Sequence, residues 1–204
     1  MCIANTRAVE ELKQSQAQQL RQVIRESPWL IRALDALSNC GGECAYIGAG
    51  AIRNLLWDRL HGTVESAIPD DLDVVFFDAN VKRGEAEETL LRKLRSKEPE
   101  LPWDVTNQAY VHHWYAEHLG FSVPPFDSLE DAIKAWPETA TAIAARRDTR
   151  GEIHLVAPWG LDDLFGLVLR PSTTCKDPEA FEKRLVSKRF VKRWSRLRVV
   201  GAGE

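Results

Sequence analysis

Two aspartates, Asp71 and Asp73, are separated by a single residue at the start of an apolar segment, in the sequence PDDLDVVFFD. The segment 72–77 is apolar on both sides of the alternation, which predicts an interior β-strand covered on both faces of a sheet. Residues two apart on a strand point to the same face, so we expect these two side chains to lie side by side. Carboxylates on such a strand are costly unless something compensates their charge, and a divalent cation suits oxygen ligands.

A glycine-containing turn precedes this strand in the sequence YIGAGAIRNLLWD. A short apolar strand predicted over 45–47 breaks at the glycines and leads directly into a helix predicted over 51–60. Glycine lets backbone amides approach a phosphate, and the N-terminus of a helix favours negative charge. The turn is therefore a candidate phosphate-binding site, and an arginine one turn into the helix can pair with phosphate or with the aspartates. The candidate residues are Gly48, Ala49, Gly50 and Arg53.

A third carboxylate, Asp104, lies on another short predicted strand, 103–106, in the sequence WDVTNQ. The order of glycine turn, helix, Asp-x-Asp strand and later aspartate is more specific than either motif alone. Phosphoryl and nucleotidyl transfer need metal ions that bridge the attacking and leaving oxygens, and amide donors that hold the phosphates in line. The combined pattern indicates a site for a divalent metal and phosphate.

These motifs resemble those of the DNA polymerase β-like nucleotidyltransferase superfamily. YIGAGAIRNLLWD is similar to the GGxVRDxLL stretch of tRNA CCA-adding enzymes, and PDDLDVVFF is similar to their DxD strand. The resemblance is greatest to a bacterial nucleotidyltransferase-like family, through IGAGAIRN, DDLDVVFFD, WDVTNQ, APWGLDDLFGLVLRP and the terminal KRW. It implies that Asp71 and Asp73 hold Mg²⁺, with Mn²⁺ as the alternative. It also implies that Asp104 completes the metal site and helps to align or deprotonate an acceptor hydroxyl.

The chain departs from the tRNA enzymes at two places. Gly48-Ala49-Gly50 replaces their double glycine, and Asn54 stands where they carry aspartate. No long helical RNA-binding extension is recognised, so a CCA-adding role is not expected. The resemblance therefore implies the chemistry and leaves the acceptor open among small molecules, protein side chains and RNA.

The leading hypothesis is an Mg²⁺-dependent nucleotidyltransferase that transfers a nucleoside monophosphate from an NTP to a hydroxyl acceptor and releases pyrophosphate. The alternative is a noncatalytic nucleotide-binding or regulatory module, such as an antitoxin-like protein, with the same fold. A third hypothesis is an RNA-binding adaptor that uses the basic C-terminal residues. No feature of the sequence indicates an oligomeric state.

The whole chain, residues 1–204, is long enough for one domain with its own core. Helices are predicted over 1–39, strands alternating with helices over 40–157, and mainly helices over 158–204. This order predicts an α+β fold, a polymerase β-like core of a small mixed sheet flanked by helices, with N- and C-terminal helices.

Charge gives no general reason to expect a nucleic acid partner, because the formal net charge is −3. Basic residues nevertheless crowd the segment 177–194, predicted as one helix with Phe181, Leu185 and Val191 on its apolar side. Such a run is usually a solvated helix face, and contact with RNA phosphates is the alternative. The N-terminus lacks a secretory signal pattern and no apolar run is long enough to span a membrane, so we expect a cytoplasmic protein without membrane contact. Cys40 and Cys44 lack a second ligand pair for zinc.

Each candidate also has a purely structural interpretation. Asp71 can end a loop, Asp73 can pair with Arg53, and Asp104 can serve as a turn residue. The adjacent His112 and His113 point about 100° apart on a helix, which disfavours a shared metal ion. Asp162 and Asp163 suit a helix N-terminus. Asn107 and Gln108 suit either a contact to a base or ribose or the entry to a helix, and the seven tryptophans are interpreted mostly as core residues.

Overall fold

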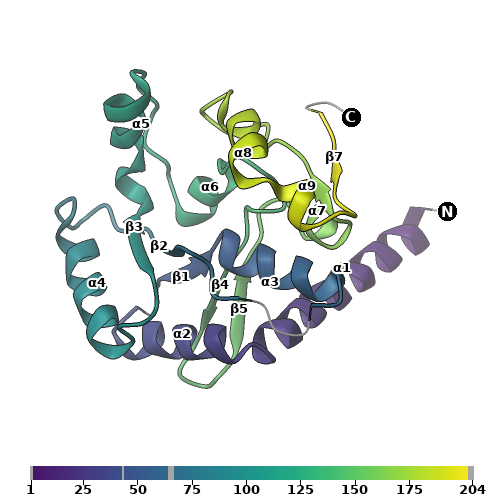
Figure 1. Ribbon diagram of the computed structural model, residues 1–204, viewed down its shortest axis with the longest axis horizontal. Helices are drawn as coiled ribbons and strands as arrows, with labels where there is room; N and C mark the ends of the chain where they lie inside the picture. Colours follow the sequence, from purple (N-terminus) through teal and green to yellow (C-terminus); the bar gives the residue numbers. More distant parts are fainter. Residues whose placement is uncertain (1, 43, 64–66, 202–204) are drawn as a thin grey trace.

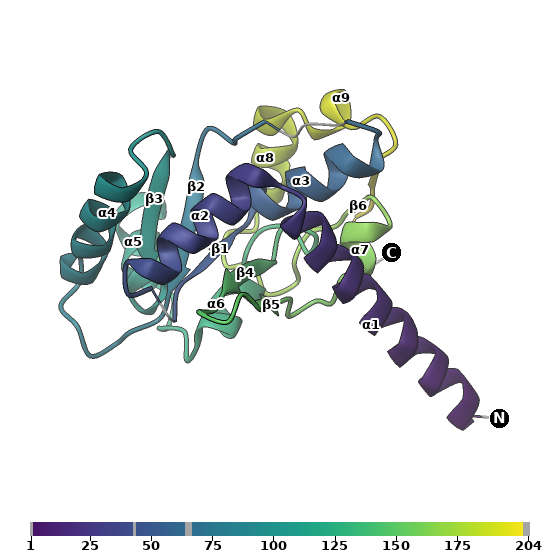
Figure 2. The ribbon, with the colours of Figure 1, turned by 90° about the horizontal axis from the view of Figure 1, so that it is seen from below.

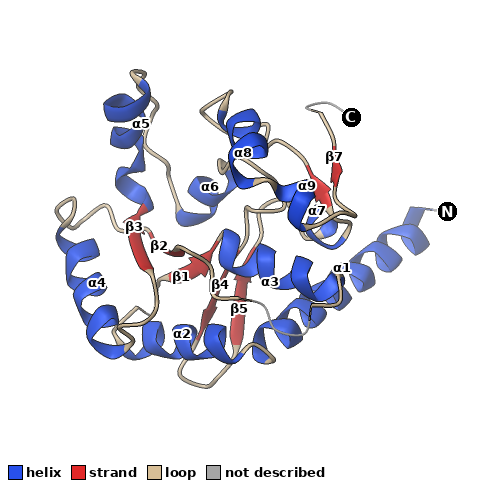
Figure 3. Ribbon diagram, viewed as in Figure 1, coloured by secondary structure: helices blue, strands red, loops and turns tan. Residues whose placement is uncertain are grey.

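The computed structural model describes residues 2–42, 44–63 and 67–201 of the protein. At its centre is a mixed sheet of five strands in the order β3-β2-β1-β4-β5, flanked by helices (Figures 1 and 3). Strands β2 and β3 are parallel, and every other neighbouring pair in this sheet is antiparallel. The bounds are Tyr46–Gly48 for β1, Leu72–Phe76 for β2, Trp103–Asn107 for β3, Ala144–Arg147 for β4 and Ile153–Val156 for β5.

The helices surround this sheet on both faces and at its β3 edge. Figure 2 shows α2 crossing one face of the sheet and α1 extending away from it. Figure 1 shows α5 and α8 projecting above the other face. The helices are α1 Cys2–Arg25, α2 Pro28–Asn39, α3 Gly50–Leu60, α4 Glu85–Lys97, the 3₁₀ turn η1 Gln108–Tyr110, α5 Val111–Leu119, α6 Leu129–Lys134, α7 Asp162–Phe165, α8 Ala180–Lys188 and α9 Phe190–Arg193.

The two faces of the sheet differ in how much apolar surface covers them. Leu72 and Val74 of β2 belong to the main core, which also contains side chains of α2, α3 and α4. Val75 points to the opposite face and joins a smaller cluster with Ile133 and Ala144. Because the alternation of β2 assigns Asp73 to the same face as Val75, the incompletely covered face is the one that carries the aspartate.

The predicted fold class is confirmed, and so is the prediction that the strand bearing Asp73 is interior to the sheet. The predicted segments 45–47, 51–60, 72–77 and 103–106 correspond to β1, α3, β2 and β3 with small shifts of their ends. No helix in the described part of the chain is long and apolar enough to cross a membrane. The proposed division of the chain at 39 and 157 stays a prediction.

The prediction of one helix over 177–194 is wrong. Arg189 takes a left-handed backbone conformation, with φ of +50°, which ends α8 and starts α9 in a new direction. Val191, predicted to be apolar-side, is 47 % exposed, whereas Phe190 and Trp194 are buried. The change of direction turns these two aromatic rings toward Trp57 of α3.

Three further differences concern short elements. The sequence pattern predicts one helix over 108–119 and a strand over 139–146, whereas the structure has the 3₁₀ turn η1 followed by α5, and β4 begins at Ala144. A small parallel pair joins β6, Val168–Leu169, to β7, Arg198–Val199, and the sequence did not indicate it. Strands of two residues are too short to show a hydrophobic alternation.

Candidate active site

Three aspartates lie at the same end of β2 and β3. Asp73 and Asp104 are direct partners in the parallel register of these strands, so their side chains point to the same face of the sheet. Asp71 immediately precedes β2 and is exposed, like Asp104, whereas Asp73 is half-buried. The structure therefore brings the predicted carboxylates to one face of two neighbouring strands.

The carboxyl group of Asp73 has a raised pKa, about 6. Burial is the largest cause, and the negative charges of Asp71 and Asp104 raise the pKa further. Arg184 and Lys188 of α8 lower it, but by less. Asp73 is thus within electrostatic reach of both other aspartates and carries a charge that its surroundings do not neutralise.

The donor set suits a magnesium ion that is shared with a phosphate ligand. Within residues 2–42, 44–63 and 67–201, no group of three or more His, Cys, Asp or Glu side chains forms a complete metal-binding cluster. Magnesium does not need such a cluster, because it usually keeps several waters and takes one or two carboxylates together with substrate phosphates. The negative charge of Asp73 is not balanced by nearby cations, and the carboxylate oxygens of Asp71 and Asp104 lie within electrostatic reach of it. This arrangement fits that pattern.

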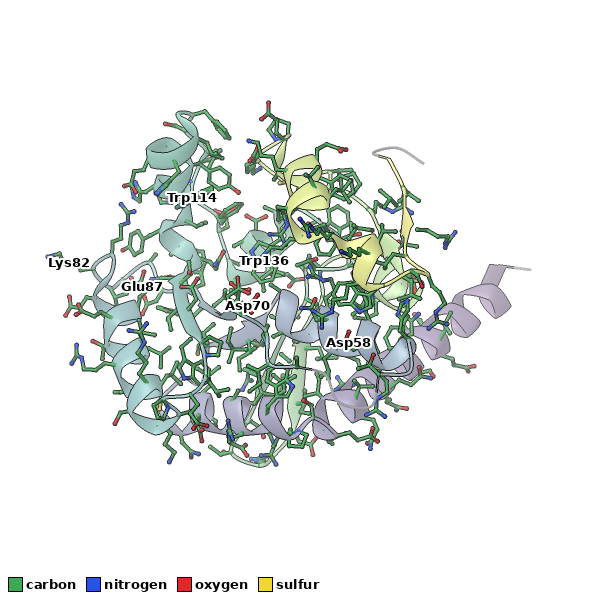
Figure 4. The ribbon with its side chains drawn as sticks, viewed as in Figure 1. Asp58, Asp70, Lys82, Glu87, Trp114 and Trp136 are labelled. Carbon is green, nitrogen blue, oxygen red and sulfur yellow. The ribbon has the colours of Figure 1, made fainter. Side chains whose placement is uncertain are left out.

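Asp71 and Asp73 border a cavity of about 510 Å³, here called the central cavity. It lies between the uncovered face of β2, the N-terminus of α3 and the helices α8 and α9. In Figure 4, Asp70 and Trp136 mark its position near the centre of the molecule. Its polar and charged lining residues are Arg53, Asn54, Asp70, Asp71, Asp73, Thr106, Gln108, Thr141, Arg184, Lys188 and Arg193.

The turn between β1 and α3 meets the central cavity through Ala49 and Gly50. Ala49 is the N-cap residue of α3 and makes no side-chain hydrogen bond to it, because alanine has no acceptor. The first amides of a helix have no partner within the helix, and here no side chain of the cap replaces one. The N-terminus of α3 therefore presents amide donors and the positive end of its dipole beside the central cavity.

Gly48 does not line the central cavity. A β-carbon at this position would lie 2.8 Å from Cη2 of Trp136 and 3.1 Å from the carbonyl oxygen of Ile143. Gly50 has room for one, since the nearest atoms to its β-carbon position, on Asn54 and Arg53, are 3.7 and 3.8 Å away. Packing against Trp136 thus accounts for the first glycine of the motif.

Arg53 is buried at the edge of the central cavity and held by several groups. Its Nη1 donates a hydrogen bond of 2.6 Å to Oγ1 of Thr141, and its Nη2 donates one of 2.9 Å to Oδ1 of Asn54. Its ion pair is with Glu138, at 3.9 Å between Nη1 and Oε2. Burial lowers the pKa of Arg53 to about 10, so the guanidinium stays charged at neutral pH.

Glu138 also binds a second cation of the central cavity. Its side chain is completely buried, and Nε of Arg184 donates a hydrogen bond of 2.5 Å to its Oε1. One buried carboxylate therefore fixes Arg53 of α3 and Arg184 of α8 beside the same cavity. The alternative from the sequence, an ion pair of Arg53 with Asp73, is not found among the described residues, although the Asp73 charge does raise the pKa of Arg53.

Sequence reasoning missed the cations that the C-terminal helices contribute. Arg184 and Lys188 are four residues apart on α8, a spacing that places two side chains on one face of a helix. Arg193 of α9 donates to Oδ2 of Asp58 at 2.8 Å, and Nε1 of Trp194 donates to Oδ1 of the same carboxylate at 2.8 Å. These contacts fasten α9 to α3. The spacing of four within the basic run was the available signal.

Asp104 borders a different hollow, called here the outer hollow, with a volume of about 600 Å³. Trp103, Pro102 and Arg95 line it as well. Asp70 and Asp71 line both the outer hollow and the central cavity. The acidic residues therefore separate two spaces, with Asp73 on the inner side and Asp104 on the outer side.

Two of the remaining candidates from the sequence, Asn107 and Asp163, have structural partners. Asn107 caps η1, since its Oδ1 accepts from the amide of Ala109. Asp163 accepts hydrogen bonds from Thr139 and Arg170. The rings of His112 and His113 lie 4.0 Å apart on α5, outside the central cavity. Of the tryptophans, Trp57, Trp103 and Trp194 are buried, whereas Trp114 is 44 % exposed.

The chain is similar to a known protein family and to several solved structures. A family profile described as "Nucleotidyltransferase" matches residues 36–199. A solution structure described as revealing a CCA-adding enzyme head domain is 28 % identical, with a TM-score of 0.75 over 91 % of this chain and 96 % of that chain. No curated protein sequence matches.

Two complexes of CCA-adding enzymes show the same fold at lower identity. The complex with CTP is 15 % identical, with a TM-score of 0.56 over 90 % of this chain and 43 % of that chain. The Thermotoga maritima enzyme complexed with tRNA is 16 % identical, with a TM-score of 0.52 over 85 % of this chain and 39 % of that chain. The present chain thus spans less than half the length of these two proteins.

Proposed function

Because the chain belongs to the nucleotidyltransferase family, we propose that it transfers a nucleoside monophosphate from an NTP to a hydroxyl acceptor, with Mg²⁺ as cofactor. Membership of this family confirms the resemblance that the motifs IGAGAIRN and DDLDVVFFD indicated. The observation that carries the proposal is the central cavity, where an uncapped helix N-terminus and the half-buried Asp73 border one space. Amide donors suit phosphate oxygens, and the carboxylate suits the cation that accompanies them.

Each group in the central cavity has a proposed role. The amides at the start of α3, beside Ala49 and Gly50, bind the β- and γ-phosphates. Arg53, fixed by Glu138 and Thr141, adds positive charge behind that turn. Gly48 supports the turn through its packing against Trp136.

The carboxylates Asp71, Asp73 and Asp104 are proposed to hold the metal ion. When bound, Mg²⁺ would offset the negative charge of the phosphates and of the leaving pyrophosphate. Asp104, on the side of the outer hollow, accepts the proton of the acceptor hydroxyl as its oxygen bonds to the α-phosphorus. The bond between the α-phosphorus and its bridging oxygen breaks, and pyrophosphate leaves toward Arg184 and Lys188.

Binding of Mg-NTP in the presence and absence of EDTA tests the phosphate and metal site. We expect Mg²⁺-dependent binding by the wild type, weakened about tenfold or more by Asp71→Asn and by Asp73→Asn because each loses a ligand charge. The matched control is Asp127→Asn, since Asp127 is exposed and lines neither the central cavity nor the outer hollow. Wild-type protein that binds no NTP, or unchanged binding by both site variants, would contradict the proposal.

The acceptor is a small molecule, a protein side chain or an RNA. Among the similar structures, CCA-adding enzymes are complexed with CTP and with tRNA, and those ligands are properties of those proteins. Incubation of the protein with each α-labelled NTP, Mg²⁺ and a cell extract identifies the acceptor by the molecule that acquires the label. The Asp104→Asn variant provides the blank, because it keeps the phosphate site and loses the proposed base.

One observation favours a second candidate, a nucleotide-binding module without catalysis. Asp104 borders the outer hollow, and among the described residues only Asp70 and Asp71 border both that hollow and the central cavity. A module of this kind would bind Mg-NTP and would transfer no label to any molecule of the extract. The two experiments above therefore separate the candidates.

A further inference from the structure

A third cavity adjoins the central cavity and is larger, about 690 Å³. It lies between the end of β3, the projecting helix α5 and the start of α8. The two cavities share a wall that consists of Thr106, Gln108, Trp136, Pro137 and Arg184. A ligand that occupies the central cavity can therefore extend directly into this neighbouring space.

Several aromatic side chains line this space, here called the aromatic cavity. Tyr110, Trp114, Tyr115, Phe126 and Trp136 all line it. Figure 4 shows Trp114 on α5 and Trp136 toward the centre of the molecule, so the rings come from different parts of the lining. Trp114 is 44 % exposed, and the ring of His118 stacks on it at 5.0 Å between ring centroids. Such rings suit a planar ligand, which gains contact with their faces.

The amide of Gln108 is the polar group that the fold leaves without a partner there. Gln108 is only 5 % exposed, and its side chain makes no hydrogen bond to any residue that the structure describes. The adjacent Asn107, also buried, is fully used: its Oδ1 accepts from the amide of Asp78, and its Nδ2 donates to the carbonyl of Asp78. Because Gln108 lines both cavities, its amide offers one hydrogen-bond donor group and one acceptor to a ligand in that space.

The charged residues that line the aromatic cavity are mostly neutralised within the protein. The cations there have carboxylate partners, and the lining carboxylates Glu87 and Asp177 form no ion pair among the described residues, so the space offers no unpaired cation to a phosphate. This composition favours an uncharged aromatic heterocycle over a second phosphate. The pairs are Arg83 with Glu117, Lys183 with Glu179, and Arg184 with Glu138.

The positions of Asp104 and Gln108 along β3 indicate where the acceptor and where the NTP would lie. Asp104, near the start of the strand, borders the outer hollow, whereas Asn107 ends the strand and Gln108 follows it. At about 3.3 Å per residue, Asp104 and Asn107 are roughly 10 Å apart along β3. The acceptor hydroxyl therefore belongs on the Asp104 side, and the part of the NTP beyond its phosphates belongs on the Gln108 side.

We propose that the aromatic cavity binds the nucleobase of the NTP, with the Gln108 amide hydrogen-bonded to the edge of the base. Nucleobases present hydrogen-bond donors and acceptors on their edges, and a neutral amide complements both. The aromatic side chains contact the faces of the base. This inference rests on the proposed function, since it assigns the phosphates of the same ligand to the central cavity.

Comparison of Mg-NTPs with Mg-tripolyphosphate tests the inference, because tripolyphosphate has the phosphates without the base. We expect the best of the four NTPs to bind the wild type about tenfold or more tightly than tripolyphosphate. Gln108→Met keeps the length of the side chain and removes the amide, and should weaken binding of that NTP about fivefold. Trp114→Ala should weaken it by a similar factor. Trp114→Ala, at a residue that lines the aromatic cavity and not the central cavity, should leave the affinity for tripolyphosphate unchanged, and Gln108→Met, in the shared wall, should lower it by less than it lowers the affinity for the NTP.

Phe121→Ala is the matched control for Trp114→Ala. Phe121 is an exposed aromatic residue just after α5, contacts Tyr115 and does not line the aromatic cavity. Its removal should leave both affinities unchanged. Thermal melts of each variant verify folding, and exposed Trp114 can be replaced without opening the core.

The outcomes separate the inference from the proposed function. If tripolyphosphate and all NTPs bind equally, or if neither Gln108→Met nor Trp114→Ala weakens NTP binding selectively, the base does not occupy the aromatic cavity and the phosphate site stands. If neither tripolyphosphate nor any NTP binds, the proposed function itself fails. Selective loss of NTP affinity in both variants supports the inference.

Discussion

Asp73 is a residue whose position in the site costs the fold stability. The free protein holds this carboxylate half-buried next to Asp71 and Asp104, and its pKa is about 6. The folded state therefore binds the proton more tightly than the unfolded chain, where the pKa of an aspartate is about 3.9. The stability that this proton supplies is fully present below about pH 4 and is lost as pH rises through about 6.

Replacement of Asp73 by asparagine should therefore stabilise the free protein at high pH. Asp73→Asn should raise the free energy of unfolding at pH 8 by up to about 3 kcal/mol and change it little at pH 4, because the charge costs stability only when it is present. Urea denaturation at the two pH values measures the difference. Asp127→Asn, at an exposed position, should show no such dependence on pH. A variant that is less stable than wild type at pH 8 would refute this account.

Glu138 shows which residues of the site the sequence could not reveal. Its partners Arg53 and Arg184 are distant in the sequence, and nothing in the local pattern of Pro137-Glu138-Thr139 distinguishes a buried carboxylate from a loop residue. Asp71, Asp73 and Asp104 could be found because each lies on or beside a strand with a readable apolar pattern. Motifs formed by neighbouring residues were predictable, whereas partners joined only by folding were not.

The turn between β1 and α3 contains two glycines that the sequence motif treats alike and that have different surroundings in the structure. The sequence groups Gly48 and Gly50 in one phosphate-binding motif. In the structure, Gly48 packs against Trp136, and Gly50 borders the central cavity with space around its α-carbon. The two glycines can therefore be separated experimentally.

Alanine substitutions at the two positions should have opposite effects. Gly48→Ala should destabilise the fold by about 1–3 kcal/mol, because its β-carbon overlaps the ring of Trp136. Gly50→Ala should change stability by less than about 1 kcal/mol, because there is room for its β-carbon, but should weaken Mg-tripolyphosphate binding by crowding the first amides of α3. Denaturation and binding measured on both variants decide this. The assignment is wrong if Gly48→Ala folds like wild type while Gly50→Ala is destabilised.

For residues 177–194, the sequence pattern correctly predicted helical residues but predicted the wrong side chain, Val191, to be buried. The periodicity of 177–194 continues across Arg189, and an arginine carries no signal for the left-handed conformation that breaks the helix there. The burial of Phe190 and Trp194 depends on Trp57 of α3, far earlier in the chain. Contacts of this kind override local pattern, which is why α8 and α9 were predicted as one element.

One face of the central sheet packs against the main core, and the other face borders the central cavity. The core beneath β2 fixes the strand, while α8 and α9 cover the opposite face from a distance that leaves the central cavity. The fold class was predictable because the spacing of apolar residues along the chain indicates the order of strands and helices. The cavities were not, since their walls combine segments from α3 to α9.

Ligand binding should consequently slow amide hydrogen exchange on both sides of the central cavity. Mg-NTP should slow amide hydrogen exchange at the N-terminus of α3 and also in α8, because Arg184 and Lys188 face the same ligand as Asp73. Hydrogen exchange followed by mass spectrometry measures this, and Asp73→Asn should abolish the protection in both segments. Protection confined to α3 and β2 would show that α8 takes no part in binding.

The wall shared by the central and aromatic cavities has a practical consequence for inhibitor discovery. Two small fragments, one anionic and one aromatic, would sit in contact across Gln108 and Trp136. A short covalent link between them would turn the second binding event into an intramolecular one, with a high effective concentration and little loss of entropy. Weak fragments found separately for each space are therefore starting points for linked compounds of much greater affinity.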